Sequence, residues 1–404
     1  MTKHSWDLLA LGAILVLAFV VRFIAALAWE SRFGHHLVFG DSESYWYLAR
    51  CLARGEPYQF GDFGTVFRMP GYPALLAPLF WFFDEPPVLA ARVVGSVLGV
   101  TAVLLTVFWA RQLFGSRAGW FAGLMMTFHP EMVLSSVLIL SEAAFIPFWI
   151  AHLFGLSVVF SNAIGHDLAQ KKATVFMLGC LAGVTTLIRP VTLVWLPFLV
   201  TIMAVFSRQS RRHLVLWAML FLGFGAMMFP WWLRNYYVTG RWVVTTTQAG
   251  PTLYDGLHPT ATGASDMTFV PTKLEQLRQR MPDASPIDLE LEFNRRLAFE
   301  ALQWAWSHPR QVMRLAVVKF CRLWNPCPND PGFNVFPINA VVGASFAATL
   351  GLGLAGLIKS RARGWALVSC WLPVIYVTAL HVVFVASIRY RWPALPGLIV
   401  LSAG

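Results

Sequence analysis

Long apolar runs separated by short polar turns dominate this chain. A helix that crosses a bilayer needs about 20 mostly apolar residues, with roughly 17–25 tolerated. Ten runs fit or approach this length, so the pattern predicts an all-α, polytopic membrane protein of about ten spans. The predicted spans are Leu8–Ala28, Pro87–Ala110, Ala118–Leu134, Ala143–Phe160, Ala173–Ile188, Pro190–Ser207, His213–Leu233, Phe336–Ile358, Trp365–Ser387 and Trp392–Gly404.

Basic residues mark one side of the predicted membrane. With the N-terminus inside, ten spans place every basic cluster of the short turns on the cytoplasmic side, in agreement with the positive-inside rule. Removing any one span breaks this agreement, so we expect both termini in the cytoplasm. The clusters are Arg111 with Arg117, Lys171 with Lys172, Arg208 with Arg211 and Arg212, and Lys359 with Arg361 and Arg363.

Two long polar stretches lie outside in this topology. The first, residues 29–86, holds a predicted helix at Ser42–Arg54 and a proline-flanked apolar piece at Tyr72–Phe83 that is expected to lie along the interface. The second, residues 234–334, holds an amphipathic segment at Leu289–Leu323 whose tryptophans suit the headgroup layer. The predicted organisation is a transmembrane module at 1–233 that includes the first loop, the outer loop at 234–334, and C-terminal spans at 335–404.

The composition agrees with lipid as the solvent for much of the chain. Hydrophobic residues make up 57% and charged residues only 13% of the sequence, whereas about a quarter of the residues in soluble domains are charged. The net charge of +11 would suit nucleic acid, but the basic residues lie in the turns, so topology explains them better. Cys321 and Cys327 fall in the second outer loop and could form a disulfide.

Two acidic residues near the outer ends of predicted spans are candidates for chemistry. Asp41 precedes the Ser42–Arg54 helix, which Asp41 or Ser42 is expected to cap. Asp41 is also a candidate carboxylate base at the membrane surface, and the two roles are compatible. Glu142 opens a span, where it either lies favourably in the helix dipole or forms a second carboxylate of the same outer cleft. We expect the cleft to be lined further by Glu43, Tyr45, Tyr72 and His129.

Arginines gather at the same predicted face. Arg68, in Phe67-Arg68-Met69-Pro70, lies at headgroup depth, where it either snorkels to lipid phosphate or holds a bound lipid phosphate. Guanidinium forks match phosphate oxygens, so several of them at one face suggest a phosphate-lipid site. The predicted phosphate-binding residues are Arg68, Arg189, Arg234, Arg389 and Arg391.

Neither a metal site nor a soluble nucleotide site is predicted. His35 and His36 lie near Asp41 but lack the spacing of a metal site, so we expect no metal and no other cofactor. Glycine-rich phosphate loops are also absent from the sequence, which disfavours a nucleotide-sugar donor.

The order of these motifs resembles a known family over nearly the whole chain. The motifs are Gly40-Asp41-Ser42-Glu43-Ser44-Tyr45, Arg68-Met69-Pro70-Gly71-Tyr72-Pro73, Leu140-Ser141-Glu142, Arg189-Pro190, Pro230-Trp231-Trp232-Leu233-Arg234-Asn235 and Ser387-Ile388-Arg389-Tyr390-Arg391. Together they resemble the GT-C glycosyltransferases of the protein-mannosyltransferase and aminoarabinose-transferase type, which is glycosyltransferase family 39. Phe67-Arg68 departs from the acidic-plus-lysine pair of the aminoarabinose type, which leaves the acceptor open.

This resemblance implies an activity and a place in the cell. It implies a polyprenyl-phosphate-linked sugar as donor, inversion at the anomeric carbon, and a lipid, glycan or protein as acceptor. It also implies Asp41 as the base, Glu142 as a second acidic residue, and an active site on the extracytoplasmic face of the cytoplasmic membrane.

Two other classes of protein fit parts of the pattern. A secondary transporter or flippase for a lipid-linked or anionic substrate would explain the spans and the charges. Such folds favour internal repeats and charges near the bilayer midplane, whereas these charges lie at one face. A membrane scaffold is the other option, and it would not need acids and arginines that converge.

Overall fold

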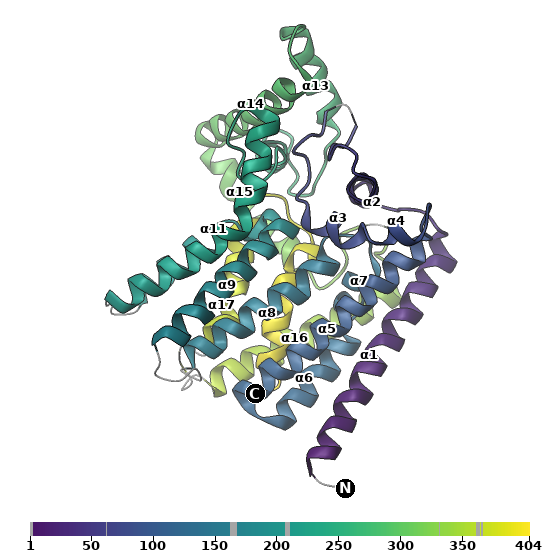
Figure 1. Cartoon of the computed structure of the whole chain (residues 1–404), viewed down its shortest axis with the longest axis vertical. Helices are drawn as coiled ribbons and strands as arrows, with labels where there is room; N and C mark the ends of the chain where they lie inside the picture. The colour runs from purple at the N-terminus through teal and green to yellow at the C-terminus, as the bar shows by residue number, and fades with distance from the viewer. Residues whose placement is uncertain are drawn as a thin grey trace.

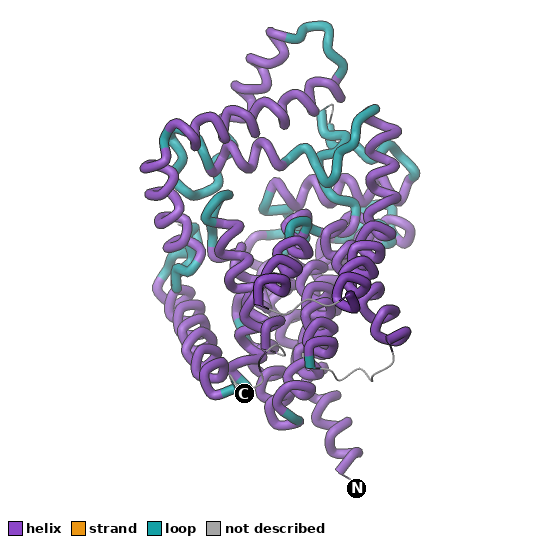
Figure 2. The backbone as a smooth tube through the Cα atoms, turned by 90° about the vertical axis from the view of Figure 1, so that its left-hand side faces the viewer, coloured by secondary structure: helices purple, strands orange, loops and turns teal. Residues whose placement is uncertain are grey.

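The computed structural model describes residues 3–61, 63–161, 168–206, 211–330, 332–360, 364 and 367–404 (Figure 1). The predicted cytoplasmic residues Arg208, Arg361 and Arg363 lie outside these ranges, as does the predicted start of a span at Trp365. Helices form nearly all of the regular structure (Figure 2), so the prediction of an all-α protein is confirmed.

Six of the ten predicted spans correspond to single long helices. In the described ranges, these six are long and apolar enough to cross a membrane, and the chain is accordingly a multi-pass membrane protein. They are α1 (Lys3–Phe33), α5 (Val88–Phe114), α8 (Glu142–Phe160), α9 (Leu168–Ile188), α11 (Arg211–Thr239) and α16 (Phe336–Lys359).

The other four predicted spans consist of shorter helices, so the count of ten stays a prediction. They contain α6 (Ser116–Phe128), α7 (Pro130–Val137), η1 (Pro190–Thr192), α10 (Trp195–Phe206), α17 (Val368–His381), η3 (Ile388–Ala394) and α18 (Leu395–Ser402).

The prediction of one continuous helix at Ala118–Leu134 is wrong. The helix stops at His129, whose backbone is extended, because the residue before a proline avoids the α conformation. Arg22 of α1 is buried beside the break and donates to the carbonyls of Met126 at 3.1 Å and Thr127 at 3.5 Å. The buried cation therefore satisfies carbonyls that the end of α6 leaves without a helical partner.

The remaining helices gather at one end of the bundle, called the loop end below (Figure 1). The predicted piece at Tyr72–Phe83 forms two short helices that cross this end, and the predicted segment at Leu289–Leu323 breaks at Pro309 into two. The loop-end helices are α2 (Gly40–Arg54), α3 (Gly71–Leu76), α4 (Leu79–Phe82), α12 (Ala249–Gly256), α13 (Phe269–Arg280), α14 (Pro286–Ser307) and α15 (Pro309–Leu323).

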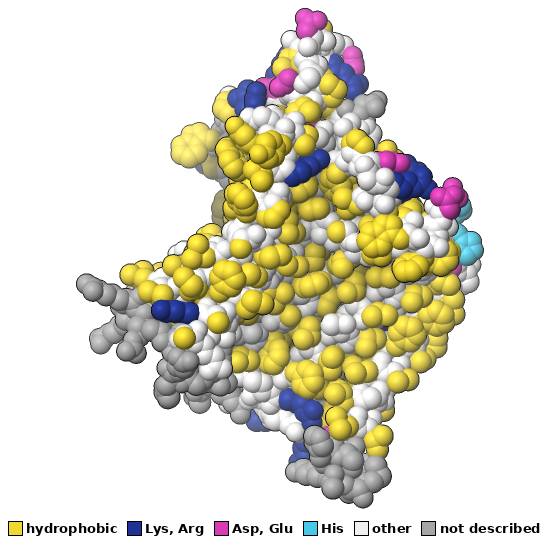
Figure 3. Space-filling model, viewed as in Figure 1, with side chains coloured by type: hydrophobic (Ala, Val, Ile, Leu, Met, Phe, Trp, Pro, Cys, Tyr) yellow, Lys and Arg dark blue, Asp and Glu magenta, His cyan; other side chains and the backbone are white. Residues whose placement is uncertain are grey.

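The surface of the bundle is apolar where lipid would contact it. Figure 3 shows hydrophobic side chains over the middle of the molecule and charged side chains towards the two ends. Large side chains such as Val16 and Leu222 are more than half exposed there, which suits hydrocarbon and not water. Both termini lie at the end opposite the loop end, which agrees with the predicted even number of crossings (Figure 1).

Close packing of α9 against α11 sets the position of Arg189, which follows α9. A Cβ on Gly179 would lie 2.0 Å from the carbonyl oxygen of Leu220, and one on Gly223 would lie 2.0 Å from that of Phe176. Only glycine permits this approach, so the two helices form a rigid pair beside the site.

We predict that the loop end faces outward. Single cysteines at Asp84 and Thr260, both exposed at the loop end, should react with a membrane-impermeant thiol reagent on intact cells. A cysteine at Ser116, in the turn between α5 and α6, should react only after the cells are opened, because the predicted topology places that turn in the cytoplasm. The native cysteines are replaced first. Labelling of Ser116 in intact cells would contradict the orientation.

Candidate functional site

Five charged side chains from five separate segments meet at the loop end. Asp41 comes from the first turn of α2, Glu142 is the first residue of α8, and Arg189 directly follows α9. Arg68 precedes α3 and Arg389 lies in η3. These five residues, called the charge cluster below, were all predicted as site residues from the sequence.

Asp41 directs its carboxylate to arginines and not to the helix that it begins. The capping position of α2 is Phe39, without a side-chain hydrogen bond, so the prediction that Asp41 caps the helix is wrong. Arg68 donates to Asp41 Oδ1 at 2.5 Å, and Arg389 donates to Oδ2 at 3.3 and 3.4 Å. The Asp41 side chain is 36% exposed, so it is the most open member of the cluster.

The arginines also control the ionisation of Asp41. Burial raises the pKa of this carboxyl, but the charges of Arg68 and Arg389 outweigh burial and hold the pKa below its usual value. Asp41 is therefore ionised at neutral pH, and it is a weaker base while both arginines contact it.

Glu142 is fully buried and holds two guanidiniums. Arg389 donates to it through Nε and, at 3.1 Å, through Nη2, and Arg189 forms an ion pair with the same carboxylate. The alternative in which Glu142 lines the same outer cleft as Asp41 does not match this burial. Its position as the first residue of α8 does match the predicted favourable helix dipole.

The cluster carries an excess of positive charge. Three guanidiniums face two carboxylates, which leaves one positive charge if all five groups are ionised. The ring of Tyr390 supports two of the guanidiniums, with centroid distances of 5.6 Å to Arg189 and 5.9 Å to Arg389. Such a cluster attracts an anion at the face where Asp41 and Arg389 are partly exposed.

Four other predicted residues lie outside the cluster. Arg391 is fully buried and forms two hydrogen bonds with Glu131, at 2.7 and 3.1 Å. Arg234 donates to the carbonyls of Tyr58 and Thr65, both at 2.8 Å. Glu43 points to solvent, and His129 is buried at the break before α7. We therefore remove Arg234, Arg391, Glu43 and His129 from the candidate site.

The two predicted tyrosines support the cluster. Tyr45 and Tyr72 are buried and form an edge-to-face pair, with ring centroids 5.2 Å apart. The guanidinium of Arg68 lies 5.2 Å from the centroid of Tyr45. Tyr45 therefore packs against Arg68 and Tyr72 packs against Tyr45, so both buried rings support the cluster rather than line a surface.

Several supporting residues were not anticipated from the sequence. Ser44 accepts a hydrogen bond from Arg68 Nε at 3.0 Å, and its place one helical turn after Asp41 was the available signal. Glu290 of α14 is buried and accepts from the backbone N–H groups of Thr65 at 2.7 Å and Val66 at 2.9 Å. No local signal links residues 225 positions apart.

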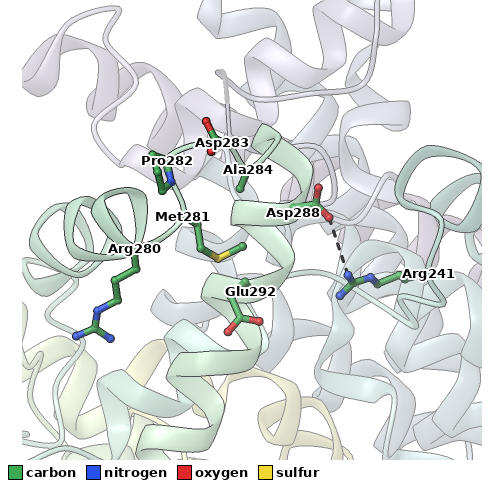
Figure 4. Close-up of a pocket in the computed structure, with 8 residues that line it drawn as sticks. All are labelled: Arg241, Arg280, Met281, Pro282, Asp283, Ala284, Asp288 and Glu292. Atoms are coloured by element: carbon green, nitrogen blue, oxygen red, sulfur yellow. Dashed lines mark ion pairs between the residues drawn. The ribbon is translucent and has the colours of Figure 1, made fainter.

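A cavity at the loop end is lined by none of the five cluster residues. It has a volume of about 420 Å³ and lies between α13, α14 and Arg241, which forms an ion pair with Asp288 across it (Figure 4). Acidic and basic side chains both line it, so its charge does not select one ligand class. Across the described part of the chain, no three His, Cys, Asp or Glu side chains are grouped to hold a metal ion.

Comparison with known proteins identifies the fold. No protein-family model matches the sequence, and no curated protein matches it. The Archaeoglobus fulgidus oligosaccharyltransferase in its apo form superposes with a TM-score of 0.62 at 15% identity, over 99% of this chain and 50% of that chain. The fold is GT-C-like.

Two further solved structures show the range of this likeness. The A. fulgidus oligosaccharyltransferase AglB, in complex with an inhibitory peptide and a dolichol-phosphate, matches with a TM-score of 0.60 at 15% identity, over 99% of this chain and 50% of that one. The chain thus spans about half the length of these proteins. ArnT from Cupriavidus metallidurans, bound to undecaprenyl phosphate, matches at 15% identity with a TM-score of only 0.47. This match covers 99% of the present chain and 78% of the ArnT chain.

We predict that Glu142 is required for stability. Glu142→Gln keeps the shape but leaves Arg189 and Arg389 without their shared carboxylate. Breaking a buried ion pair costs about 3–5 kcal/mol, so the thermal midpoint in detergent should fall clearly. The exposed Glu43→Gln is the matched control and should melt like the wild type. Equal melting of both variants would show that Glu142 does not hold the cluster together.

Proposed function

We propose that this chain is an inverting glycosyltransferase. It moves a sugar from a polyprenyl-phosphate donor to an acceptor hydroxyl at the extracytoplasmic face of the cytoplasmic membrane. The observation that carries the proposal is the charge cluster, because one partly exposed carboxylate lies in contact with two guanidiniums at the end of a GT-C-like bundle.

The arginines are assigned to the donor phosphate. Arg389 and Arg68 are partly exposed and carry the positive charge of the cluster, and guanidinium forks match phosphate oxygens in geometry and charge. The A. fulgidus AglB structure holds a dolichol-phosphate, which supports a lipid phosphate as ligand for this fold. Because negative charge grows on the phosphate as it leaves, the same arginines would stabilise the transition state.

Asp41 is assigned to the acceptor. Its carboxylate takes the proton of the acceptor hydroxyl while that oxygen bonds to the anomeric carbon. The bond from this carbon to the phosphate oxygen breaks, and the phosphate leaves with the electron pair. A donor phosphate that binds Arg389 and Arg68 would weaken their hold on Asp41 and raise the pKa of Asp41 towards its usual value. Donor binding would thereby strengthen the base.

The finer family placement rests on the sequence motifs alone. A protein-mannosyltransferase or aminoarabinose-transferase type would give a lipid, glycan or protein acceptor, and the A. fulgidus enzyme has been solved with an acceptor peptide. In this chain the acceptor would approach from the loop end, where Asp41 is the most exposed group of the cluster.

We predict that Asp41→Asn abolishes transfer without loss of donor binding. Asparagine keeps the size of the side chain but cannot accept the proton, and general-base catalysis contributes about 10²–10⁴-fold in rate. Donor affinity should hold or rise, since the arginines lose a competing carboxylate. Turnover and donor binding are measured on purified protein with a polyprenyl-phosphate sugar. Near-normal turnover would remove Asp41 from the chemistry.

We predict that Arg389→Lys weakens donor binding. Lysine keeps the positive charge beside Asp41 and Glu142 but cannot make two parallel bonds to phosphate. The loss of one hydrogen bond to a charged group, about 1.5–3 kcal/mol, corresponds to a donor Kd roughly 10–150-fold higher. Arg54→Lys is the matched control, because Arg54 lies at the other end of α2 and forms its ion pair with the exposed Asp84. An equal Kd for both variants would contradict the assignment.

A further inference from the structure

A short segment that begins with a turn leads from α17 to Arg389. This segment, residues 382–388, is called the strap below. Its last residue, Ile388, is the first residue of η3, and Arg389 comes next. The backbone position of the strap therefore determines where the Arg389 side chain begins. The N–H groups of Val382, Val383 and Phe384 bond back to carbonyls of α17, and residues 385–387 form no helix or strand.

Loop-end residues hold the strap at four points. Lys319 Nζ donates to the carbonyl of Val383 at 2.6 Å, and Arg322 Nε donates to that of Ala386 at 3.3 Å. The N–H of Ala386 donates to the carbonyl of Gly263 at 2.9 Å, and that of Ile388 donates to Asn329 Oδ1 at 2.8 Å. Every one of these partners belongs to the second outer loop.

Lys319 is the unusual member of this set. Its side chain is fully buried, and Nζ also donates to the carbonyl of Gly256 at 2.8 Å. No carboxylate in the described ranges lies within ion-pair distance of it, and burial lowers the pKa of Lys319 to about 8 although Asp255 opposes the shift. Burying an ammonium without an acidic partner is costly, so a retained one needs a reason.

Two glycines adapt the surroundings to this lysine. A Cβ on Gly256 would lie 2.9 Å from the carbonyl oxygen of Val383, so only glycine lets the end of α12 approach the strap. Gly263 has a φ of +85°, and a Cβ there would lie 3.2 Å from Lys319 Cγ. The lysine therefore joins α12, α15 and the strap in one tightly packed unit.

We propose that Lys319 is a positioning residue that sets Arg389 in the charge cluster. It bonds Val383, which precedes the start of η3 by five residues, and it takes part in none of the ion pairs of the charge cluster. Its effect on donor binding rests on the proposed function, whereas its effect on the strap does not. Displacing a reacting or binding group by about 1 Å costs up to roughly 100-fold, so loss of Lys319 should weaken the donor site measurably.

The first measurement concerns the strap alone. Hydrogen exchange of residues 382–390 is followed by mass spectrometry in detergent-solubilised protein. Lys319→Met should speed exchange at the Ala386 and Ile388 amides, because a methionine cannot bond Val383. Lys273→Met is the matched control, since Lys273 is in the same outer loop but pairs with Glu300. Unchanged exchange in Lys319→Met would overturn the proposal, whatever the protein catalyses.

The second measurement concerns the donor site. A polyprenyl phosphate is the probe, and Lys319→Met should raise its Kd about tenfold or more while Lys273→Met leaves it unchanged. If Lys319 acts through Arg389, the same substitution in an Arg389→Lys background should add little. Full additivity would overturn the proposal. Probe binding that is absent even in the wild type would refute the proposed function instead, and the exchange result would still stand.

A gentler variant covers the case in which Lys319→Met does not fold. Lys319→Gln keeps two N–H donors on a shorter side chain, so it should reach one carbonyl and not both. We expect the hydrogen-exchange rate of the strap and the Kd of the probe to lie between the wild-type values and the values expected when neither carbonyl is bonded. Wild-type values for both quantities in Lys319→Gln would overturn the proposal.

Discussion

A single guanidinium that binds two carboxylates is the interaction on which the site depends. Arg389 contacts both the buried Glu142 and the partly exposed Asp41. Without Glu142, the guanidiniums of Arg389 and Arg189 would repel each other with no carboxylate between them. Without Arg389, the carboxylates of Asp41 and Glu142 would repel each other in the same way. The arrangement keeps a strong cation and an ionised acid in contact near the surface, where a phosphate can compete for the cation.

The second outer loop acts as a scaffold for this arrangement. Glu290 of α14 binds the backbone just before Arg68, and Lys319 of α15 binds the strap just before Arg389. Both Glu290 and Lys319 are buried and bond mainly to backbone atoms. Their main effect is therefore to hold the backbone in place, and not to balance the charge of the cluster. Helices α8 and α9 of the bundle supply Glu142 and Arg189, and separate segments at the loop end supply Arg68 and Arg389.

The sequence predicted the members of the site better than their contacts. Asp41, Arg68, Glu142, Arg189 and Arg389 were each found because charge beside an apolar run is costly and their motifs share one predicted face. Glu131 could not be matched to Arg391, because partners 260 positions apart leave no local pattern. The break at His129 was readable from Pro130, but hydropathy alone joined the two helices into one span.

The most direct test of the account is release of the lipid carrier. Purified protein in lipid vesicles is incubated with a panel of polyprenyl-phosphate sugars, and free polyprenyl phosphate is measured by mass spectrometry. The account predicts release from at least one donor, with the sugar appearing on an acceptor in the inverted configuration. A protein that binds or moves these lipids across the vesicle membrane, yet leaves every sugar–phosphate bond intact, would contradict it.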